Sequence, residues 1–459
     1  MSRGTRQIIV RAAILIALIA IPLTALYAMG WRLSLREGAI VKTGALAVFP
    51  FPYGTTVSVE TKRSKTTSAI SSKAYFANLI PGSLNIEAMR AGFTPWKKIA
   101  AIEPGKTLLF PFAQLWPQKL DVIATRSAAF PSTIISSPKQ SFLLLISNDG
   151  LKVVDDKDLT VLFSTQDISA VTAVWANESP KATTVLENGT TVLVDLEDKQ
   201  NPHISPLPAG LSDALVRGDG KMLAARSGQN LVVLGLLNPA PQKTLMRNVI
   251  AFGWDASHII ALDTEGYLWR INSENPEEKT QLTNSAIKTP DAPIKIITHE
   301  GKITIYAQNG PLWFLDTDQT QALQSHERVL GFEFSPSGEK ILFRTPNEVR
   351  VHFLKERPEQ PQRKKGDETL ILRASRDLLD ASFAPGEEHV IVSTSQDIRI
   401  FELDERGGRN SATILNETIG ALDVDLRIQS LFVAFPDGRL VRFRIPTRPT
   451  IDIGGAIGL

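Results

Sequence analysis

The sequence of 459 residues contains no cysteine and only six histidines. The lack of cysteine excludes disulfides, zinc thiolate sites and cysteine nucleophiles. The histidines are scattered singly, and no two have the spacing of a metal-binding pair. Positive and negative charges almost balance, with a formal net charge of +2, so no basic excess indicates nucleic-acid binding. We expect no metal site, no cofactor and no nucleic-acid partner.

Motifs that would support catalysis are absent as well. The chain has no Gly-x-Ser-x-Gly elbow, no P-loop and no dinucleotide fingerprint. Paired carboxylates act as acid and base when a closed pocket raises the pKa of one of them. Three groups of aspartates were candidates: Asp423 with Asp425, Asp316 with Asp318, and Asp155 with Asp156 and Asp158. We interpret the first two groups as exposed strand-end or turn residues and the third as a turn without the spacing of a calcium loop, and we predict no enzyme activity and no catalytic residue.

One long apolar run is present, from Ala12 to Trp31, and it contains no charged residue. As a helix it would be about 30 Å long, enough to cross the hydrocarbon core of a membrane. Tyr27 and Trp31 at its end suit the membrane interface. The sequence therefore predicts that residues 12–31 contact the membrane as a single spanning helix.

A cleaved secretory signal is the alternative, with Arg3, Arg6 and Arg11 as its basic region. The apolar run is longer than a usual signal core, and Leu26-Tyr27-Ala28 is a poor cleavage site, so an uncleaved signal anchor is favoured. Lysines and arginines are equal in number on the two sides and do not set the orientation. We place residues 1–11 in the cytoplasm because their three arginines are hard to translocate. The rest would lie outside the cytoplasmic membrane.

A recurring turn organises the chain from residue 148 to residue 446. Asn-Gly, Asp-Gly and related pairs separate short apolar or alternating runs, and these pairs tolerate the positive φ values of tight β-hairpin turns. The second turn residues are at 150, 189, 229, 266, 310, 348, 397 and 438, with intervals of 37 to 49 residues. A period near 40 residues made only of strands is typical of a propeller blade. Eight copies predict an eight-bladed β-propeller, with seven blades as the alternative.

One repeat carries a resemblance to known propellers. Gly331 to Gly338, followed by Lys340 to Phe343, resembles blades of the WD-repeat-like and quinoprotein-like superfamily, although the His-Gly and Trp-Asp signatures of true WD repeats are missing. Leu262 to Trp269 approaches the Ser-x-Asp-x-Gly-x-x-Trp box of sialidase-type propellers, but it has three steps instead of two between its Asp and its Gly. Aromatic residues end the first strand of three repeats, and we expect them to pack between blades: Trp175, Phe334 and Phe383.

Only a short tail follows the last repeat, so the final blade needs a strand from elsewhere. We expect Lys119 to Thr125, which precedes the first repeat, to be its outer strand, and Thr450 to Ile453 is the competitor. A charged insertion, Lys355 to Thr369, lengthens one interval and is predicted to be an exposed loop.

Between the apolar run and the repeats, short strands alternate with proline and glycine. The expected strands are Ala45 to Phe49, Thr56 to Glu60, Ser83 to Met89, Trp96 to Ile102 and Thr107 to Phe112. Pro52-Tyr53-Gly54-Thr55, Leu79-Ile80-Pro81-Gly82 and Ala91-Gly92-Phe93 resemble a PEGA domain, a small β-sandwich-like module. Tyr53, Thr55 and the segment Thr61 to Lys73 depart from its pattern. The resemblance implies a location outside the cytoplasmic membrane.

A basic cluster, Lys62 to Lys65, lies in the segment that departs from the PEGA pattern. We interpret it as a solvated hairpin tip, with contact to lipid headgroups or wall polymers as the alternative.

The sequence thus predicts an all-β chain with five parts: a cytoplasmic tail (1–11), a transmembrane signal anchor (12–31), a PEGA-like domain (44–117), a β-propeller (119–447) and a C-terminal tail (448–459). The expected function is a membrane-anchored scaffold that presents the propeller to a protein or a cell-envelope polymer. The alternatives are a carbohydrate-active propeller enzyme and a ligand-binding sensor, although the short tail leaves no room for an output domain. The sequence identifies no ligand-binding residue, no binding face and no oligomeric state.

Overall fold

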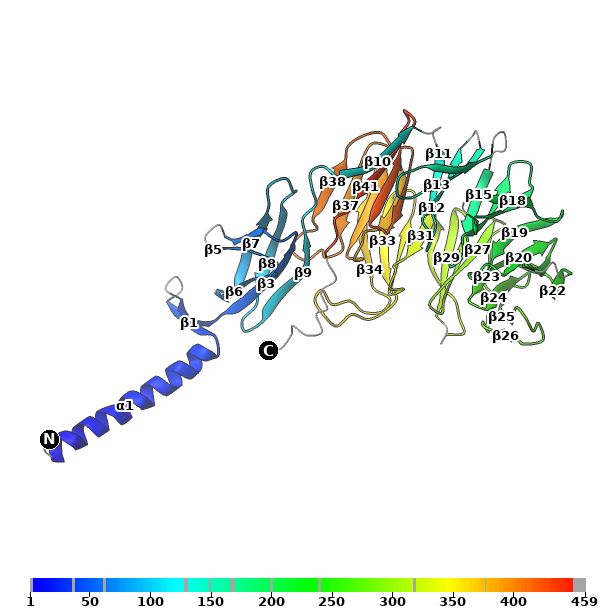
Figure 1. The fold of residues 1–459 in the computed structure, drawn as a ribbon. Helices are drawn as coiled ribbons and strands as arrows, with labels where there is room; N and C mark the ends of the chain where they lie inside the picture. Colours follow the sequence, from blue (N-terminus) through cyan, green and yellow to red (C-terminus); the bar gives the residue numbers. More distant parts are fainter. Residues whose placement is uncertain are drawn as a thin grey trace.

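The structure is a computed structural model, and it describes residues 3–34, 38–60, 63–127, 131–147, 150–165, 170–198, 201–237, 241–316, 319–375 and 377–448. The turn residues Asn148 and Asp149, the aspartate Asp318, Lys62 and the competing strand Thr450 to Ile453 lie outside the described residues. A helix, a small β-domain and a larger ring of sheets follow one another along the chain (Figure 1).

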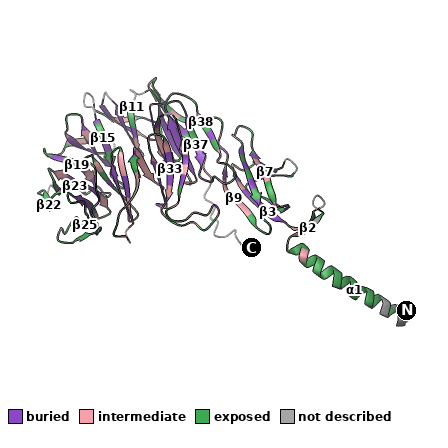
Figure 2. Cartoon of the chain, turned by 180° about the vertical axis from the view of Figure 1, so that it is seen from behind, coloured by how far each residue is buried: buried purple, intermediate pink, exposed green. Residues whose placement is uncertain are grey.

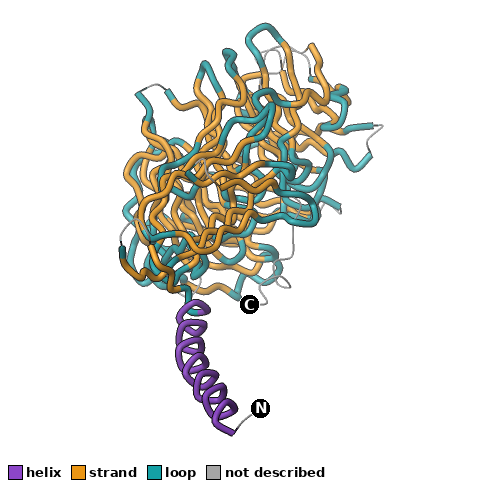
Figure 3. Tube along the Cα trace, turned by 90° about the vertical axis from the view of Figure 1, so that its left-hand side faces the viewer, coloured by secondary structure: helices purple, strands orange, loops and turns teal. Residues whose placement is uncertain are grey.

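The helix α1 (Arg3–Ala28) projects away from the β-domains (Figure 3). Its apolar part, Ile9–Ala28, is buried by no other part of the described chain. A helix of a soluble protein buries its apolar face, because apolar surface in water is unfavourable. The length and composition of α1 therefore fit a membrane anchor or a signal sequence.

A short antiparallel hairpin, β1 (Trp31–Ser34) and β2 (Ala39–Lys42), directly follows the helix. This hairpin was not expected from the sequence, because each of its strands is only four residues long.

The small domain consists of two sheets packed face to face. The first has the order β6–β3–β9, and the second has the order β5–β4–β7–β8. Their core includes Phe76, Trp96 and Phe110. The strands are β3 (Gly44–Phe51), β4 (Thr56–Val59), β5 (Arg63–Thr66), β6 (Ala74–Leu79), β7 (Gly82–Met89), β8 (Trp96–Ile102) and β9 (Thr107–Gln114). The five expected strands are confirmed, and β5 and β6 are additional.

Strand β5 corrects the interpretation of the basic cluster. Arg63 to Lys65 form part of an edge strand that pairs with β4, and they are not the tip of a hairpin. All four side chains of β5 are exposed, so no apolar alternation marks this strand in the sequence.

Eight four-stranded antiparallel sheets make up the larger part of the described chain. Each of the first seven is a simple meander in chain order. The strands of the first four sheets are β11 (Pro131–Ser136), β12 (Phe142–Ser147), β13 (Gly150–Asp155), β14 (Val161–Ser164), β15 (Ala170–Trp175), β16 (Lys181–Leu186), β17 (Thr191–Asp195), β18 (His203–Pro206), β19 (Leu211–Val216), β20 (Met222–Ser227), β21 (Asn230–Gly235), β22 (Lys243–Met246), β23 (Val249–Asp255), β24 (His258–Asp263), β25 (Leu268–Asn272) and β26 (Lys279–Gln281).

The remaining sheets follow the same pattern up to the last, which takes a strand from the start of the ring. Their strands are β27 (Ile294–His299), β28 (Lys302–Ala307), β29 (Gly310–Asp316), β30 (Leu323–Val329), β31 (Gly331–Phe334), β32 (Lys340–Arg344), β33 (Glu348–Phe353), β34 (Glu368–Arg373), β35 (Leu378–Phe383), β36 (His389–Thr394), β37 (Ile398–Glu402), β38 (Ser411–Leu415), β39 (Ala421–Asp425), β40 (Ser430–Ala434), β41 (Arg439–Arg444) and β10 (Asp121–Ser127).

The last sheet packs against the first and closes the ring. The inner strands β39 and β11 lie side by side, and one apolar cluster combines Leu143 and Leu145 with Phe432 and Ala434. Strand β10 pairs antiparallel with β41 as the outer strand of the last sheet. The predicted closure is therefore confirmed, and the ring is a β-propeller. Because this sheet combines strands from the start and the end of the propeller segment, the hydrogen bonds between them hold the ring closed.

The propeller core lies between neighbouring sheets. Middle strands such as β12, β36 and β40 are buried along their whole length. Buried segments, drawn in purple, run through the sheets of the propeller (Figure 2). The indole of Trp175 stacks on Phe142 of the preceding sheet, with ring centroids 6.4 Å apart, and donates to the carbonyl of Ile135 at 3.1 Å. Phe334 stacks in the same way on His299. The predicted role of these aromatic residues between sheets is confirmed for both.

Candidate functional site

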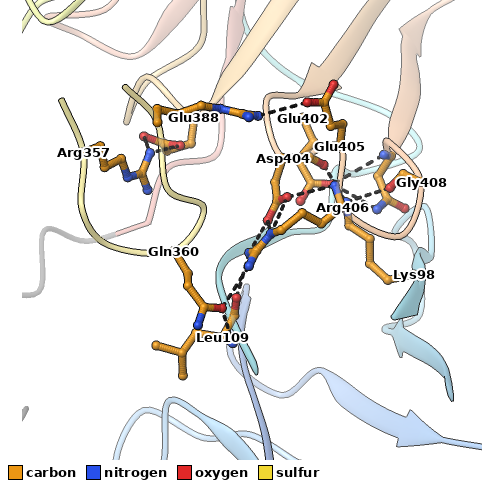
Figure 4. Close-up of polar contacts among 12 residues, drawn as sticks. Lys98, Leu109, Arg357, Gln360, Glu388, Glu402, Asp404, Glu405, Arg406 and Gly408 are labelled. Carbon is orange, nitrogen blue, oxygen red and sulfur yellow. Dashed lines mark hydrogen bonds and ion pairs between the residues drawn. The ribbon is translucent and has the colours of Figure 1, made fainter. Parts of the chain in front are cut away.

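A buried polar junction joins the small domain to the propeller. Strand β8 alternates between buried and exposed side chains, and Lys98 occupies a buried position. Its ammonium contacts Glu402 Oε2 at 3.0 Å and donates to the carbonyls of Asp404 at 2.6 Å and Gly408 at 2.7 Å (Figure 4). The side chain of Lys98 is 0% exposed and that of Glu402 is 2% exposed. Lys98 is thus a buried cation held by three oxygens of the propeller.

The propeller loop between β37 and β38 also pairs with the backbone of β8. The amide of Ile99 donates to the carbonyl of Gly407 at 2.9 Å. Asn410 accepts from the amide of Lys97 at 2.8 Å and donates to its carbonyl at 3.0 Å. Gly407 has a φ of +66°, and a Cβ there would lie 2.4 Å from the carbonyl oxygen of Ile99. Only glycine permits this close approach.

Arg406 makes a second set of contacts across the junction. Its guanidinium donates to the carbonyl of Leu109 at 2.8 Å and to Gln360 Oε1 at 2.9 Å (Figure 4). Asp404 holds it from behind through an ion pair of 2.6 Å. Gln360 Oε1 also accepts from the amide of Leu109 at 3.0 Å. The small domain, the β37–β38 loop and the charged insertion therefore meet at one point.

The charged insertion is not simply an exposed loop, so that prediction is wrong for its middle part. Arg357 pairs with Glu388 at 3.0 Å, and its guanidinium lies over the ring of Phe112, 4.7 Å from the centroid. Lys365 pairs with Asp316 at 2.8 Å. The charged composition gives no sign of this contact, because the charge of Arg357 is met by a carboxylate and an aromatic face from elsewhere in the chain.

An uncharged histidine fills the junction beside this network. His389 is 3% exposed and packs edge-on against Trp116, with ring centroids 5.3 Å apart. Burial lowers the pKa of His389 to about 3, and the charges of Lys98 and Arg448 act in the same direction. Arg448 itself donates to two backbone carbonyls of the small domain.

Three carboxylates of consecutive inner strands interact electrostatically: Glu333 on β31, Asp380 on β35 and Asp423 on β39. Burial raises the pKa of Glu333 to about 8, and the charges of Asp380 and Asp423 add to the effect. Burial likewise raises the pKa of Asp423 to about 6. Asp423 is thus not an exposed strand-end residue, because its neighbours come from the adjoining sheets and cannot be seen in the local sequence.

Two of these carboxylates connect neighbouring sheets. Glu333 Oε2 accepts from the amide of Phe383 at 3.3 Å, and Asp423 Oδ2 accepts from the amide of Ser136 at 2.8 Å and from its hydroxyl. Each bond reaches the inner strand of the next sheet, and the second crosses the closure of the ring. The arrangement holds adjacent inner strands together.

The other candidate aspartates divide between the ring closure and turns. Asp425 is 5% exposed and shares Arg427 with the fully buried Asp156 of the first sheet, at 2.9 and 2.7 Å. The prediction of an exposed residue is wrong for Asp425, whereas Asp156 lies in the predicted turn but is buried, since this contact joins residues 271 positions apart. Asp155 and Asp158 accept from backbone amides two positions later, as turn residues do.

A groove of about 740 Å³ opens between two neighbouring sheets at the end of the ring that carries the tight turns. In an antiparallel meander, successive connections between strands lie at opposite ends of the sheet. The tight turns join the second and third strands of each sheet, whereas the junction with the small domain uses the connections between the third and fourth strands, β33–β34 and β37–β38. The junction therefore lies at the end of the ring opposite the groove. The groove is therefore not covered by the small domain. Its lining residues are His326, Glu327, Arg328, Thr345, Pro346, Asn347, Ala374, Ser375 and Asp377.

Two histidines share one carboxylate beside the groove. Glu368 contacts His326 Nε2 at 3.2 Å and His352 Nδ1 at 3.3 Å. Burial alone would raise the pKa of Glu368, but the hydrogen bond from His352 and the charge of His326 outweigh it and lower the pKa to about 2. Among the described residues no group of histidines and carboxylates has the arrangement of a metal site.

The segment that approaches the sialidase-type box has a structural role. Asp263 Oδ1 accepts from the amides of Glu265 and Tyr267 at 3.0 and 2.8 Å, and Oδ2 accepts from the indole of Trp269 at 2.7 Å. Asp263 thus holds the β24–β25 turn closed.

We expect Asp263→Ala to destabilise the protein by about 2 kcal/mol, because it leaves two turn amides and an indole without their charged acceptor. Chemical denaturation followed by tryptophan fluorescence measures the change. Glu265→Ala, an exposed substitution in the same turn, is the control, and equal effects of the two would contradict the assigned role.

Comparisons with known proteins show no family for this chain. No family model matches the chain, and no curated protein matches it. The C-terminal WD40 domain of Sif2 is 13% identical, with 72% of this chain and 99% of that chain covered and a TM-score of 0.49. The computationally designed Ika8 protein is 12% identical over 71% of this chain and 99% of its own, with a TM-score of 0.49. The β-propeller domain of Cps50 (Swd1) from Myceliophteria thermophila is 12% identical over 71% of this chain and 100% of its own, with a TM-score of 0.44.

Proposed function

We propose that this chain is a membrane-anchored scaffold that presents its propeller, at a fixed place outside the cytoplasmic membrane, to a protein or cell-envelope polymer. In this proposal α1 is the uncleaved anchor, the small sandwich is a PEGA-like spacer, and the eight four-stranded sheets are eight blades. The proposal includes no catalytic role.

The buried junction is the observation that carries the proposal. A cation with no solvent exposure, held by Glu402 and by two carbonyls, tolerates little movement between the domains, because separation would leave buried charges unpaired. The propeller is therefore held as one body with the segment that follows α1, and its turn-bearing end stays free for a partner.

A partner is best sought at the free end of the ring. The groove there combines cationic, anionic and hydroxyl side chains without a large apolar surface, which suits a polar protein segment or a polymer better than an apolar ligand.

Photo-crosslinking in intact cells tests the proposal. We expect a crosslinker at Ser375, in the groove, to give a defined adduct with an envelope component, and external protease to cleave the propeller. The matched control is a crosslinker at Ser64, an exposed residue of the edge strand β5. Protection from external protease would contradict the topology, and equal labelling at both positions would contradict the groove as the binding face.

The carbohydrate-active alternative has one observation in its favour, the cluster of Glu333, Asp380 and Asp423. Clustered carboxylates with separated pKa values are what such chemistry requires. Glu333 and Asp423, however, accept hydrogen bonds from backbone amides of neighbouring sheets, and this structural role explains both residues without a substrate. Loss of a measured glycan-cleaving activity in both Glu333→Gln and Asp423→Asn, with partner binding intact, would favour the enzyme instead.

A further inference from the structure

The β1–β2 hairpin is held between the end of α1 and the small domain. The amide and the hydroxyl of Thr43 both donate to the carbonyl of Gly30 at 2.8 Å, and the amide of Gly105 donates to the carbonyl of Thr43 at 3.0 Å. Arg32 lies over the ring of Tyr27 and donates to its carbonyl. The position of the hairpin is therefore set by contacts on both sides.

One face of this hairpin exposes two aliphatic side chains, Leu33 and Ile40, beyond the pair formed by Lys42 and the partly buried Trp31. Leu33 and Ile40 are directly opposite each other in the antiparallel register and share a face with Trp31. Leu33 is 65% exposed and Ile40 is 59% exposed. The apolar core of the neighbouring sandwich contains none of the three. Such a pair exposed to water is unfavourable, so its natural surroundings are apolar.

The place of the hairpin in the chain determines which apolar surroundings are within reach. The apolar span ends at Ala28, three residues before β1 begins. Tyr27 is also exposed at this end of the helix, and the hairpin projects sideways from it (Figure 1). A strand pair that leaves the end of a spanning helix sideways lies along the membrane surface. Aromatic residues and arginine side chains such as Arg32 are typical of that boundary.

We propose that the β1–β2 hairpin is a second membrane contact, in which Leu33 and Ile40 insert into the lipid interface of the bilayer that α1 spans. This inference rests on the proposed anchoring by α1. A helix alone permits rotation and tilt, whereas a helix and a hairpin together fix the orientation of the small domain. Because the junction at Lys98 holds the propeller to the small domain, the orientation of the propeller is then fixed as well.

Depth-dependent quenching in vesicles tests the inference, and the absence of cysteine makes single-cysteine labelling unambiguous. The full chain is reconstituted in phosphatidylcholine and phosphatidylglycerol vesicles with a fluorophore at Leu33→Cys or Ile40→Cys. Ala20→Cys reports the bilayer interior, and Ser64→Cys reports water. We expect a shallow nitroxide lipid to quench the two hairpin positions at least threefold more than Ser64, and a deep nitroxide lipid to quench them less than Ala20.

The possible outcomes separate the two proposals. If aqueous iodide quenches the hairpin positions as strongly as Ser64 while Ala20 is quenched from within the lipid, the hairpin inference is overturned and the anchor stands. If Ala20 is also open to iodide, anchoring by α1 fails and the inference fails with it. If the hairpin positions are protected from iodide only at high protein-to-lipid ratios, a second copy of the chain covers them instead of lipid, and this result also overturns the inference.

The orientation itself is measured by energy transfer from a label at Asp437→Cys, on an exposed propeller turn, to a labelled lipid surface. We expect the double substitution Leu33→Ser and Ile40→Ser to broaden the distribution of heights above the membrane while the protein stays membrane-bound. An unchanged distribution would overturn the role of the hairpin in orientation.

Discussion

Substitution of Lys98 by alanine is expected to destabilise the small domain and its junction by about 3 to 5 kcal/mol. The substitution leaves the buried carboxylate of Glu402 without its cation, and it leaves the carbonyls of Asp404 and Gly408 without their donor. Loss of one partner of a buried ion pair costs this much because the remaining charge stays desolvated. Hydrogen exchange of the full chain measures the effect locally, at the Ile99 amide that bonds to Gly407.

The neighbouring residue provides the matched control. Lys97 pairs with Glu87 at 2.8 Å, but its side chain is 67% exposed, so Lys97→Ala should cost at most about 1 kcal/mol. Similar exchange in the two variants would show that the junction does not depend on the buried pair. A third variant, Lys98→Met with Glu402→Leu, should recover only the part of the loss that comes from the unpaired charge, because the carbonyls of Asp404 and Gly408 still lack a donor.

The strands and the closure of the propeller follow from local sequence signals. Turn pairs such as Asn188-Gly189 fix the hairpins, and alternating or continuous apolar runs fix the strands. The closure by β10 follows from counting strands, because the last repeat supplies only three strands of its own sheet. The inferences about hairpins hold because strand pairing within a meander joins residues close in sequence, whereas the closure pairs strands from opposite ends of the propeller and rests on the strand count.

The junction could not be predicted in the same way, because it joins residues about three hundred positions apart. Lys97 and Lys98 look alike as sequence, and only their positions in β8 differ. A signal was nevertheless present: the alternation of Trp96, Lys98, Ala100 and Ile102 puts a lysine at a core position. A charge in the buried phase of a strand indicates a partner from elsewhere in the chain.

The inner-strand carboxylates left a similar signal. Glu333, Asp380 and Asp423 occupy corresponding places near the start of the first strand in three consecutive repeats. Pairing Asp423 with Asp425 on the same strand misses this pattern, because the carboxylates that interact with Asp423 lie at the same position of the preceding repeats. Repeat proteins place corresponding residues side by side around a ring.

The last large effect expected is a change in how the stability of the propeller depends on pH. The pKa of Glu333 is about 8 in the folded chain and near 4.5 in an unfolded one. Between these values the folded chain holds a proton that the unfolded chain releases, so the free energy of unfolding falls as pH rises, by at most about 1.4 kcal/mol per pH unit, and levels off above about 8.

Glu333→Gln should remove most of this slope, because glutamine cannot ionise yet still accepts from the amide of Phe383. Denaturant unfolding between pH 5 and 9 measures it, and the free energy of unfolding of the variant relative to the parent should increase steadily from pH 5 to pH 8. Asp423→Asn should flatten the curve only below about pH 6, where the pKa of Asp423 lies, and the exposed Glu187→Gln should leave the curve unchanged. A slope that persists in Glu333→Gln would mean that this carboxylate is already ionised at neutral pH. In that case water or a cation must reach the inner strands, and the centre of the ring would be open to solvent at the level of Glu333.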